Sequence, residues 1–509
     1  MHWADVEAGE LESEKSLIAT GEAPSGPIHL GHIREVLTGE AISRSSNGEL
    51  LLIVDSIDPL RRSYPFLDDS YDAHIGKPLS DIPCLCGDHE NYAEHFMDPF
   101  LRSLEELGVD LKVEYAHEMY ARGDYEEVNR RIIRERDKVA KIIEEETGRE
   151  LKDGWFPYNP ICSDCGRIDF TEPISFDDPY VNYTCECGYE GKADIRKDDG
   201  KLPWRCDWPA RWYFLGVDCE PFGKDHSASG GSWDTGKRIT KEIFKTEPPH
   251  PVVYEWIQLK GEGPMSSSSG IAIKTEDVLD ILSPEVLRFL IMNSKPRTHI
   301  DFDPGLGILD LVDEYDSCEE SYYKDKDDED MRRIYELSQV DKVPSKQPQR
   351  ISYRHLVNLV QIYEDYDKIW EVAKKTDQIQ KEREDDYERF KVRVKKVENW
   401  LEDHAPDMVK FSLKEDIPEV DLSQQEKEFI KSYLERLSEV GWDPGELHRL
   451  VHSTSDDIGI QKGKAFRSFY KILLDQNKGP RLGRFLSQLD RDFVQRRLQE
   501  AVQDKENQD

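Results

Sequence analysis

The chain has 509 residues, with 105 Asp and Glu against 69 Lys and Arg, and a net charge of −36 at pH 7. That length predicts about three domains, with enough chain to bury a large core. The charge has the wrong sign for general binding to a polyanion. We interpret it as an adaptation to a cytoplasm of very high salt, where screening shortens charge repulsion to a few ångströms.

The sequence contains no predicted membrane segment. No apolar run approaches the roughly 18 residues that a membrane helix needs. The first residues are acidic and include no apolar signal region. We therefore expect a cytoplasmic protein with no membrane partner.

Residues 15–37 predict a strand, a tight turn and a helix. Residues 15–21 are an apolar strand pattern, Pro24-Ser25-Gly26 is a turn, and a helix begins near Ile33. Backbone N–H groups at such a helix start face an anion. His29 and His32 lie there and can donate hydrogen bonds to phosphate oxygens. The alternative is a pair of structural or metal-binding histidines on a helix.

Two later stretches have unusual composition. Residues 202–212 are rich in tryptophan and are followed by Gly223-Lys224-Asp225-His226. Residues 261–270 are small and rich in hydroxyl groups, with Met265 between Gly-Pro and four serines. A flexible serine linker is the alternative for this last stretch, although the methionine is atypical of one.

The stretches around His29 and Met265 resemble the HIGH and KMSKS signatures of class I aminoacyl-tRNA synthetases. The block between them resembles the class I type of lysyl-tRNA synthetase, found mainly in archaea and some bacteria. The resemblance spans most of the first 300 residues, and with the acidic composition it suggests a halophilic source. It implies a lysine–tRNA ligase, which forms lysyl-adenylate from L-lysine and ATP and transfers the lysyl group to the 3′ end of tRNA(Lys).

The family fold is α/β, with a doubly wound parallel (Rossmann-like, HUP-type) catalytic domain. Leu50–Asp55 is an apolar run of the kind buried in a parallel sheet, and we expect further strands near 215–217 and 251–254. The expected organisation comprises a first catalytic half, a zinc-bearing insertion, a second catalytic half, a connector and an all-α anticodon-binding domain. These segments are residues 1–60, 61–200, 201–305, 306–350 and 351–509.

The resemblance assigns catalysis to the two signatures. Catalytic roles fall to His29, His32, Ser266, Ser267 and Ser268, with Mg²⁺ on the pyrophosphate. The nucleotide would contact these two histidines and a set of turn and loop residues, which are Gly21, Pro24, Ser25, Gly26, Gly31 and Met265.

A lysine substrate calls for aromatic walls and an anion, because both favour an ammonium group. The block that resembles the family's pocket contains Trp208, Trp212, Asp225 and His226, and Glu22 is a second candidate anion. Ordinary core packing is the alternative for the two tryptophans.

Two cysteine clusters predict zinc. The stronger has two close pairs of thiolates, the donor set of a structural tetrahedral site, although the second pair is one residue tighter than usual. This set is Cys162, Cys165, Cys185 and Cys187. Four thiolates leave no open position for catalysis.

The second cluster resembles another zinc site of the family. Cys84 stands where the family has Asp, and Asp88 where it has Cys, while His89 and His95 match. One thiolate, one carboxylate and two imidazoles are therefore kept. Cys86 is an alternative to Asp88, and a surface loop of free thiols is the alternative to a metal site.

The KMSKS-like loop departs from its signature, because Pro264 and Ser267 stand where the general pattern has lysines. This loss should weaken stabilisation of the leaving pyrophosphate, and Lys260 or Lys274 are candidate substitutes. A non-catalytic tRNA-binding paralogue therefore stays an alternative. So does a glutamyl- or glutaminyl-type ligase, in which Arg205 or Arg211 would bind the side-chain carboxylate.

Overall fold

The computed structural model describes residues 1–13, 15–265, 272–324, 328–376, 385–414 and 420–503. The chain forms two compact units. The first comprises residues 1–303 and 318–343, and the second comprises residues 304–317 and 344–509. No helix in the described ranges is both long and apolar enough to cross a membrane.

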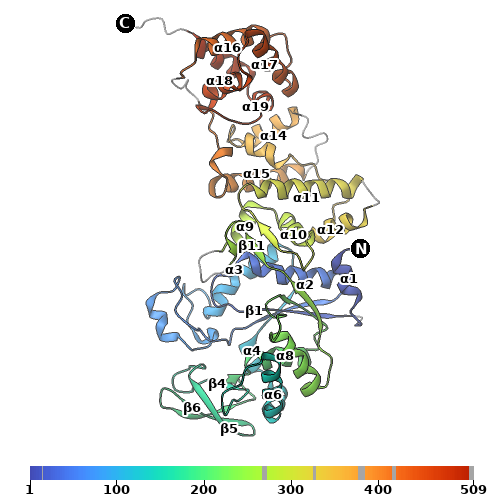
Figure 1. Cartoon of the computed structure of the whole chain (residues 1–509), viewed down its shortest axis with the longest axis vertical. Helices are drawn as coiled ribbons and strands as arrows, with labels where there is room; N and C mark the ends of the chain where they lie inside the picture. Colours follow the sequence, from blue (N-terminus) through green and yellow to red (C-terminus); the bar gives the residue numbers. More distant parts are fainter. Residues whose placement is uncertain (14, 266–271, 325–327, 377–384, 415–419, 504–509) are drawn as a thin grey trace. The chain divides into compact units, whose positions relative to one another are not determined.

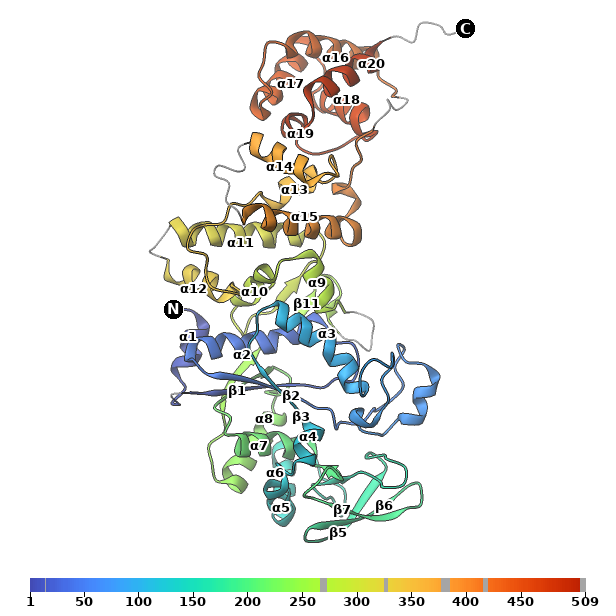
Figure 2. The ribbon, with the colours of Figure 1, turned by 180° about the vertical axis from the view of Figure 1, so that it is seen from behind.

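The first unit is built on a five-stranded parallel sheet in the order β10-β9-β1-β2-β3 (Figures 1 and 2). Its strands are β1 (Leu17–Glu22), β2 (Glu49–Val54), β3 (Lys112–Tyr115), β9 (Cys219–Gly223) and β10 (His250–Tyr254). The chain winds outward from β1 to β3 and then restarts on the other side of β1. The winding therefore reverses between β1 and β9, and ligands of such sheets bind at the carboxyl ends of the strands at this point. The predicted doubly wound fold is confirmed.

Helices cover both faces of this sheet, as the alternation along β1 requires. Gly39 of α2 (Ile33–Ser46) lies against Ile18, Thr20 and Leu50 on one face. Ala19 points to the other face, where it belongs to a core cluster with Trp208, Trp212 and Phe222. The two tryptophans come from α7 (Trp204–Leu215), and Figure 2 shows α2 and α7 on opposite sides of the strands.

The strand predicted near 215–217 begins later, at Cys219. Residues up to Leu215 belong to α7, and Gly216 ends that helix in the left-handed conformation, with φ of 70°. Glycine adopts this conformation without strain, so it stops the helix there. The strand follows two residues further on.

Residues 61–200 contain the sheet's edge strand β3 and a group of smaller elements. The helices are α3 (Tyr92–Glu106), α4 (Ala116–Ala121), α5 (Glu126–Arg134) and α6 (Arg136–Thr147). An antiparallel ribbon comprises β5 (Thr171–Asp177), β6 (Tyr180–Cys185) and β7 (Glu190–Asp194), beside the short pair β4 (Asn159–Pro160) and β8 (Gly200–Lys201).

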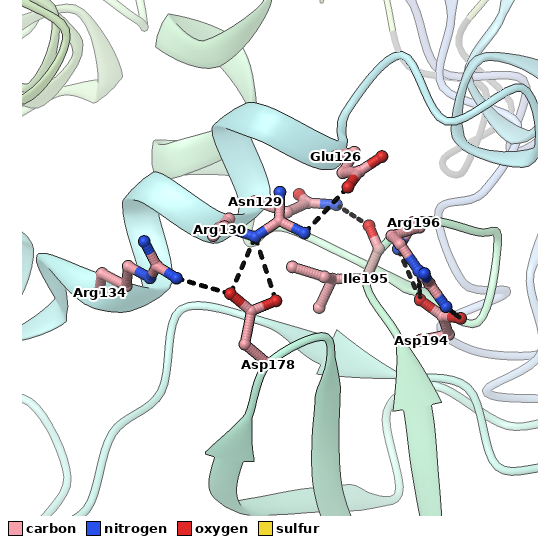
Figure 3. A network of polar contacts seen from close by, with 8 residues as sticks. All are labelled: Glu126, Asn129, Arg130, Arg134, Asp178, Asp194, Ile195 and Arg196. Carbon is pink, nitrogen blue, oxygen red and sulfur yellow. Dashed lines mark hydrogen bonds and ion pairs between the residues drawn. The ribbon is translucent and has the colours of Figure 1, made fainter.

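Polar contacts attach this ribbon to α5 (Figure 3). Arg130 donates from Nε to both carboxylate oxygens of Asp178, at 3.0 and 3.1 Å, and Arg134 donates to the same carboxylate at 2.6 Å. The side-chain amide of Asn129, which is fully buried, donates to the carbonyl of Ile195 at 2.9 Å. The hairpin turn and the end of the ribbon are thus both held to one helix.

The rest of the first unit includes a three-stranded sheet in the order β12-β11-β13. Its elements are α1 (Trp3–Gly9), α8 (Ser232–Ile239), a π-helical turn (Thr240–Phe244), β11 (Ile257–Leu259), β12 (Gly263–Pro264), α9 (Thr275–Ile281), α10 (Pro284–Met292), β13 (Ile300–Phe302) and α12 (Glu329–Ser338). Helix α8 and the turn that follows it pack against α7.

The second unit is helical, in agreement with the predicted all-α C-terminal region. Its helices are α13 (Tyr353–Leu359), α14 (Tyr366–Lys375), α15 (Asp386–Asp403), α16 (Gln424–Leu437), α17 (Pro444–Ile458), α18 (Lys462–Leu474), α19 (Leu482–Gln488) and α20 (Arg491–Val502), and α11 (Gly307–Lys324) begins in it. The predicted capping box at Ser423 and Glu426 opens α16. Apolar side chains of α16–α20 form one core cluster.

Candidate active site

The turn after β1 lies at the carboxyl edge of the sheet, beside the winding reversal. Tyr92 of α3 donates to the carbonyl of Ser25 at 2.8 Å. Gly26 has no room for a side chain, because a Cβ there would lie 2.6 Å from the Phe66 ring. The turn lines a cavity of about 300 Å³ that also exposes His29 and His32.

His29 is held as a neutral hydrogen-bond donor. Its Nδ1 accepts from the backbone N–H of Gly31 at 3.1 Å, so the neutral ring carries its proton on Nε2. Burial, and then the neighbouring His32, lower the pKa of His29 to about 3. Gly31 is required by this geometry, since a Cβ at that position would lie 2.7 Å from Cε1 of His29.

His32 is held as a charged donor. Its Nδ1 lies 2.7 Å from Oε2 of Glu22, and its ring meets that of His29 edge-on at a centroid distance of 4.2 Å. Burial opposes the charge of this ring, but the Glu22 carboxylate outweighs it and raises the pKa of His32. His29 therefore offers a neutral N–H donor, and the Glu22 carboxylate favours the cationic form of His32 beside it.

The structure adds Glu35 and Tyr254 to the site, which the sequence analysis missed. Glu35 accepts from the backbone N–H of Gly21 at 2.8 Å and from the Tyr254 hydroxyl at 2.5 Å. Burial raises the pKa of Glu35 to about 7. The available signal was its spacing, because Glu35 follows His32 by three positions and so shares a helix face with it.

Glu220 of β9 is a second residue that the sequence analysis missed. Its buried carboxylate accepts from the indole N–H groups of both Trp208 and Trp212. Burial raises the pKa of Glu220 to about 8. An acidic residue inside an otherwise buried, apolar strand was the signal that could have identified it.

The predicted lysine-pocket residues are brought together beside Glu220. The Trp208 ring lies 4.7 Å from that of Trp212 and 5.4 Å from that of His226, measured between centroids. Asp225 is more exposed, and its carboxylate lies 3.5 Å from Nε2 of His226. Tyr254 interacts electrostatically with Glu35, Asp225 and Glu22, so the carboxylates surround one region.

Neither arginine considered for an acidic substrate is free to bind one. Arg211 is buried and forms ion pairs with Asp55 and Asp207. Arg205 donates to the carbonyls of Gly230 and Gly231, at 3.1 and 2.9 Å.

The KMSKS-like loop reaches this site at its two described ends. Met265 is buried and lines the same cavity as His29. Ser266, Ser267 and Ser268 lie outside the described residues. Beyond them, Ile273 accepts from the backbone N–H of Leu30 at 2.8 Å. The candidate substitute cations are paired, Lys260 with Asp303 at 3.2 Å and Lys274 with Glu276 at 2.9 Å.

The four-cysteine cluster fits a tetrahedral metal ion. The sulfurs of Cys162 and Cys187 lie 3.7 Å apart, and those of Cys165 and Cys185 lie 3.6 Å apart. Zn–S bonds of about 2.3 Å give tetrahedral edges of about 3.8 Å. All four donor atoms lie within 4.8 Å of one another.

The second cluster gathers Cys84, Cys86, His89 and His95. Both sulfurs lie 3.3–3.5 Å from Nδ1 of each histidine. Asp98 lies 3.4 Å from the other ring nitrogen of His89, as an outer carboxylate often does around a metal-binding histidine.

Of the two alternatives for the fourth ligand, the structure gathers Cys86 with the other three donors. Asp88 is not among the gathered donors; it faces the cluster with its backbone N–H, which bonds to the Cys86 sulfur. Gly87, with φ of 82°, makes the tight turn between the two residues.

Comparisons with known proteins identify the family of this chain. Residues 1–341 match the family model described as tRNA synthetases class I (K). The chain is 44% identical to the lysine–tRNA ligase of Archaeoglobus fulgidus, over 99% of this chain and 100% of that protein. It is 42% identical to the lysine–tRNA ligase of Thermoplasma volcanium, over 99% of both chains. Among solved structures, a glutamate–tRNA ligase from Elizabethkingia meningosepticum aligns over 96% of this chain and 99% of its own, with 13% identity and a TM-score of 0.41.

Proposed function

This chain belongs to the class I tRNA synthetases (K), and we propose that it joins L-lysine to the 3′ end of tRNA(Lys) with ATP. In the first step a carboxylate oxygen of lysine bonds to the α-phosphorus of ATP as the bond to the pyrophosphate oxygen breaks. In the second step a ribose hydroxyl of the terminal adenosine attacks the lysyl carbonyl, and AMP leaves with the bonding electrons. Such chemistry depends on positioning and charge stabilisation.

The acidic and aromatic pocket is the observation that carries the choice of lysine. Glu22, Glu35, Glu220 and Asp225 place carboxylates around Tyr254 and the two indoles. Ionised carboxylates attract an ammonium group, and indole faces bind both the aliphatic stem and the cation. Because burial raises the pKa of Glu35 to about 7 and that of Glu220 to about 8, a lysine ammonium entering beside them favours their ionised forms. The Glu22 and Asp225 carboxylates repel a glutamate side chain, and the engagement of Arg205 and Arg211 leaves neither to neutralise it.

We assign the phosphates of ATP to the part of the cavity lined by the two histidines. Neutral His29 and cationic His32 donate to oxygens of the α- and β-phosphates, where charge develops as pyrophosphate leaves. We assign the nucleotide to the surrounding turn and loop, with Ser266, Ser267 and Ser268 closing over the triphosphate. The contacts are made by Gly21, Pro24, Ser25, Gly26, Gly31 and Met265. When bound, Mg²⁺ neutralises charge on the pyrophosphate oxygens.

Both cysteine clusters are proposed as structural zinc sites. The donor sets and their spacing support two ions, held by Cys162, Cys165, Cys185 and Cys187 and by Cys84, Cys86, His89 and His95. Metal analysis of the purified protein should find about two zinc ions per chain, and the Cys162→Ser and Cys84→Ser variants about one each. An unchanged metal content in either variant would exclude that cluster.

The proposed division of labour follows the predicted segments. Residues 1–60 and 201–305 carry the reaction, 61–200 the zinc sites, 306–350 connect the parts, and the helices of 351–509 bind the anticodon arm. We place the protein in the cytoplasm, with activity that rises toward molar KCl because acidic surfaces stay solvated there. An optimum at low salt would exclude that adaptation.

Aminoacylation of total tRNA in molar KCl, with each amino acid tested separately, examines the proposal. Charging with lysine alone is expected. Charging with glutamate would show that the protein is a glutamyl-type ligase instead. If tRNA binds but no amino acid is charged, the protein is a non-catalytic paralogue.

A further inference from the structure

The two lysines of the KMSKS signature are missing at Pro264 and Ser267, yet the proposed reaction still has to stabilise a departing pyrophosphate. A positive charge at the phosphates is worth a large factor in rate for such transfers. The proposed reaction therefore calls for another cation at the cavity lined by His29 and His32, and the described residues offer several candidates.

Most cations near the site already have partners. Lys260 and Lys274 pair with Asp303 and Glu276. Arg34 is buried, and its guanidinium donates to three backbone carbonyls of the segment 295–298. Arg61 lies 3.8 Å from the carboxylate of Asp58.

Arg62 differs from all of these. It lines the cavity of about 300 Å³ together with His29, His32 and Met265. Its guanidinium lies over the Tyr64 ring, 5.2 Å from the centroid. No carboxylate in the described ranges lies within ion-pair distance of it, although the chain holds 36 more acidic than basic residues. An exposed cation that has no acidic partner in so acidic a protein is available to an anionic ligand.

A rigid aromatic stack positions Arg62 relative to the turn. Tyr64 stacks on Phe66, with a centroid distance of 5.3 Å and an angle of 6° between the rings. Phe66 lies directly against Gly26, where any Cβ would clash, and meets Phe96 of α3 edge-on at 5.6 Å. The guanidinium therefore lies on a ring stack that packs against this turn, at the cavity that the two histidines also line.

We propose that Arg62 is a catalytic residue that binds the triphosphate and supplies the positive charge absent from the KMSKS-like loop. The inference rests on the proposed function. A guanidinium stays protonated and offers paired N–H donors that match two phosphate oxygens. As the bond between the α-phosphorus and the bridging oxygen breaks, the electron pair moves to pyrophosphate, and Arg62 stabilises that charge together with His29 and His32.

The test compares Arg62→Gln, Arg62→Lys and the matched control Arg61→Gln in lysine-dependent ATP–pyrophosphate exchange. Arg62→Gln should lower kcat/KM for ATP about 100-fold, and Arg62→Lys about tenfold, because it keeps the charge and loses the paired donors. Arg61→Gln should stay within about threefold of the unmodified enzyme, and the KM for lysine should be unchanged in all three, since neither arginine contacts the lysine pocket.

Two outcomes would overturn the proposal. One is exchange by Arg62→Gln within about threefold of the unmodified enzyme, and the other is an equal loss in Arg62→Gln and Arg62→Lys, which would exclude a role of the charge. Equilibrium binding of ATP without any amino acid separates this test from the proposed function. If the unmodified protein activates no amino acid but Arg62→Gln still weakens ATP binding, the proposed function is wrong and the contact of Arg62 with the phosphates is supported.

Discussion

The amino-acid side and the phosphate side of the site are built differently. On the amino-acid side, buried polar groups hold one another in place: Glu220 fixes two indoles, and Glu35 joins Gly21 to Tyr254. On the proposed phosphate side, Arg62 is exposed, and its guanidinium lies over the Tyr64 ring with no carboxylate among the described residues at ion-pair distance. Preorganised polar groups favour selectivity, whereas an open and cationic wall suits a ligand that enters as triphosphate and leaves as pyrophosphate. The proposed selection of the amino acid therefore rests on buried groups that hold one another in place, and the positive charge proposed at the phosphates comes from His32 and from the exposed Arg62.

The largest effect should come from Glu220→Ala, which leaves two buried indole N–H groups without an acceptor. Each unpaired donor costs about 1–3 kcal/mol, so kcat/KM for lysine should fall about a thousandfold in pyrophosphate exchange. ATP binding measured without lysine should be unchanged, with thermal unfolding as the check on folding. An equal loss of ATP binding would contradict the separation of the two sides.

A smaller loss should follow from His29→Ala on the phosphate side. Removing one donor to a developing anion lowers kcat by about 100-fold in comparable sites. Lysine binding, followed by quenching of the pocket's tryptophan fluorescence, should keep its affinity. A variant with normal kcat and weakened lysine binding would show that His29 acts on lysine and not on the phosphates.

Gly31→Ala should cost less, because it displaces His29 without removing it. The new Cβ would lie 2.7 Å from Cε1 of His29, so the ring must rotate, and we expect kcat/KM for ATP to fall about tenfold. Gly9→Ala is the matched control, since no atom lies within 4 Å of a Cβ there. Equal rates for the two variants would show that the orientation of the His29 ring is unimportant.

The smallest effect concerns pH. Burial alone would lower the pKa of His32, but the Glu22 carboxylate raises it by more, so the pKa lies above the ordinary value. The cationic donor is present below that pKa, and the rate should decline as pH rises through it. In the Glu22→Gln variant the carboxylate is gone and burial lowers the pKa of His32, so the decline in rate moves to lower pH. We expect kcat at saturating lysine to be several-fold lower than in the unmodified enzyme at about pH 8. An identical pH profile would exclude the ion pair as the cause.

Much of this architecture was predictable because it depends on local pattern. The run Leu50–Val54 could only be a buried strand, and the turn before His29 follows from Pro and Gly. The partners of these elements were not predictable in the same way. Glu35 and Glu220 belong to the site because the fold places Tyr254 beside Glu35 and two indole N–H groups beside Glu220, and these partners are distant in the sequence or on another element. Likewise, choosing Cys86 over Asp88 needed the turn at Gly87, which decides whether a side chain or a backbone N–H faces the cluster.

The pairing of β1 with β9 also has a consequence for how the protein is made. Ile18 pairs with Cys219, so the centre of the sheet joins strands about 200 residues apart. At synthesis rates of about 5–20 residues per second, β1 waits some 10–40 seconds on the ribosome before its neighbour emerges. Both cysteine clusters are translated within that interval. If the two clusters bind zinc as proposed, the nascent chain can capture the metal before the sheet is complete, and zinc supply would then affect the yield of folded protein.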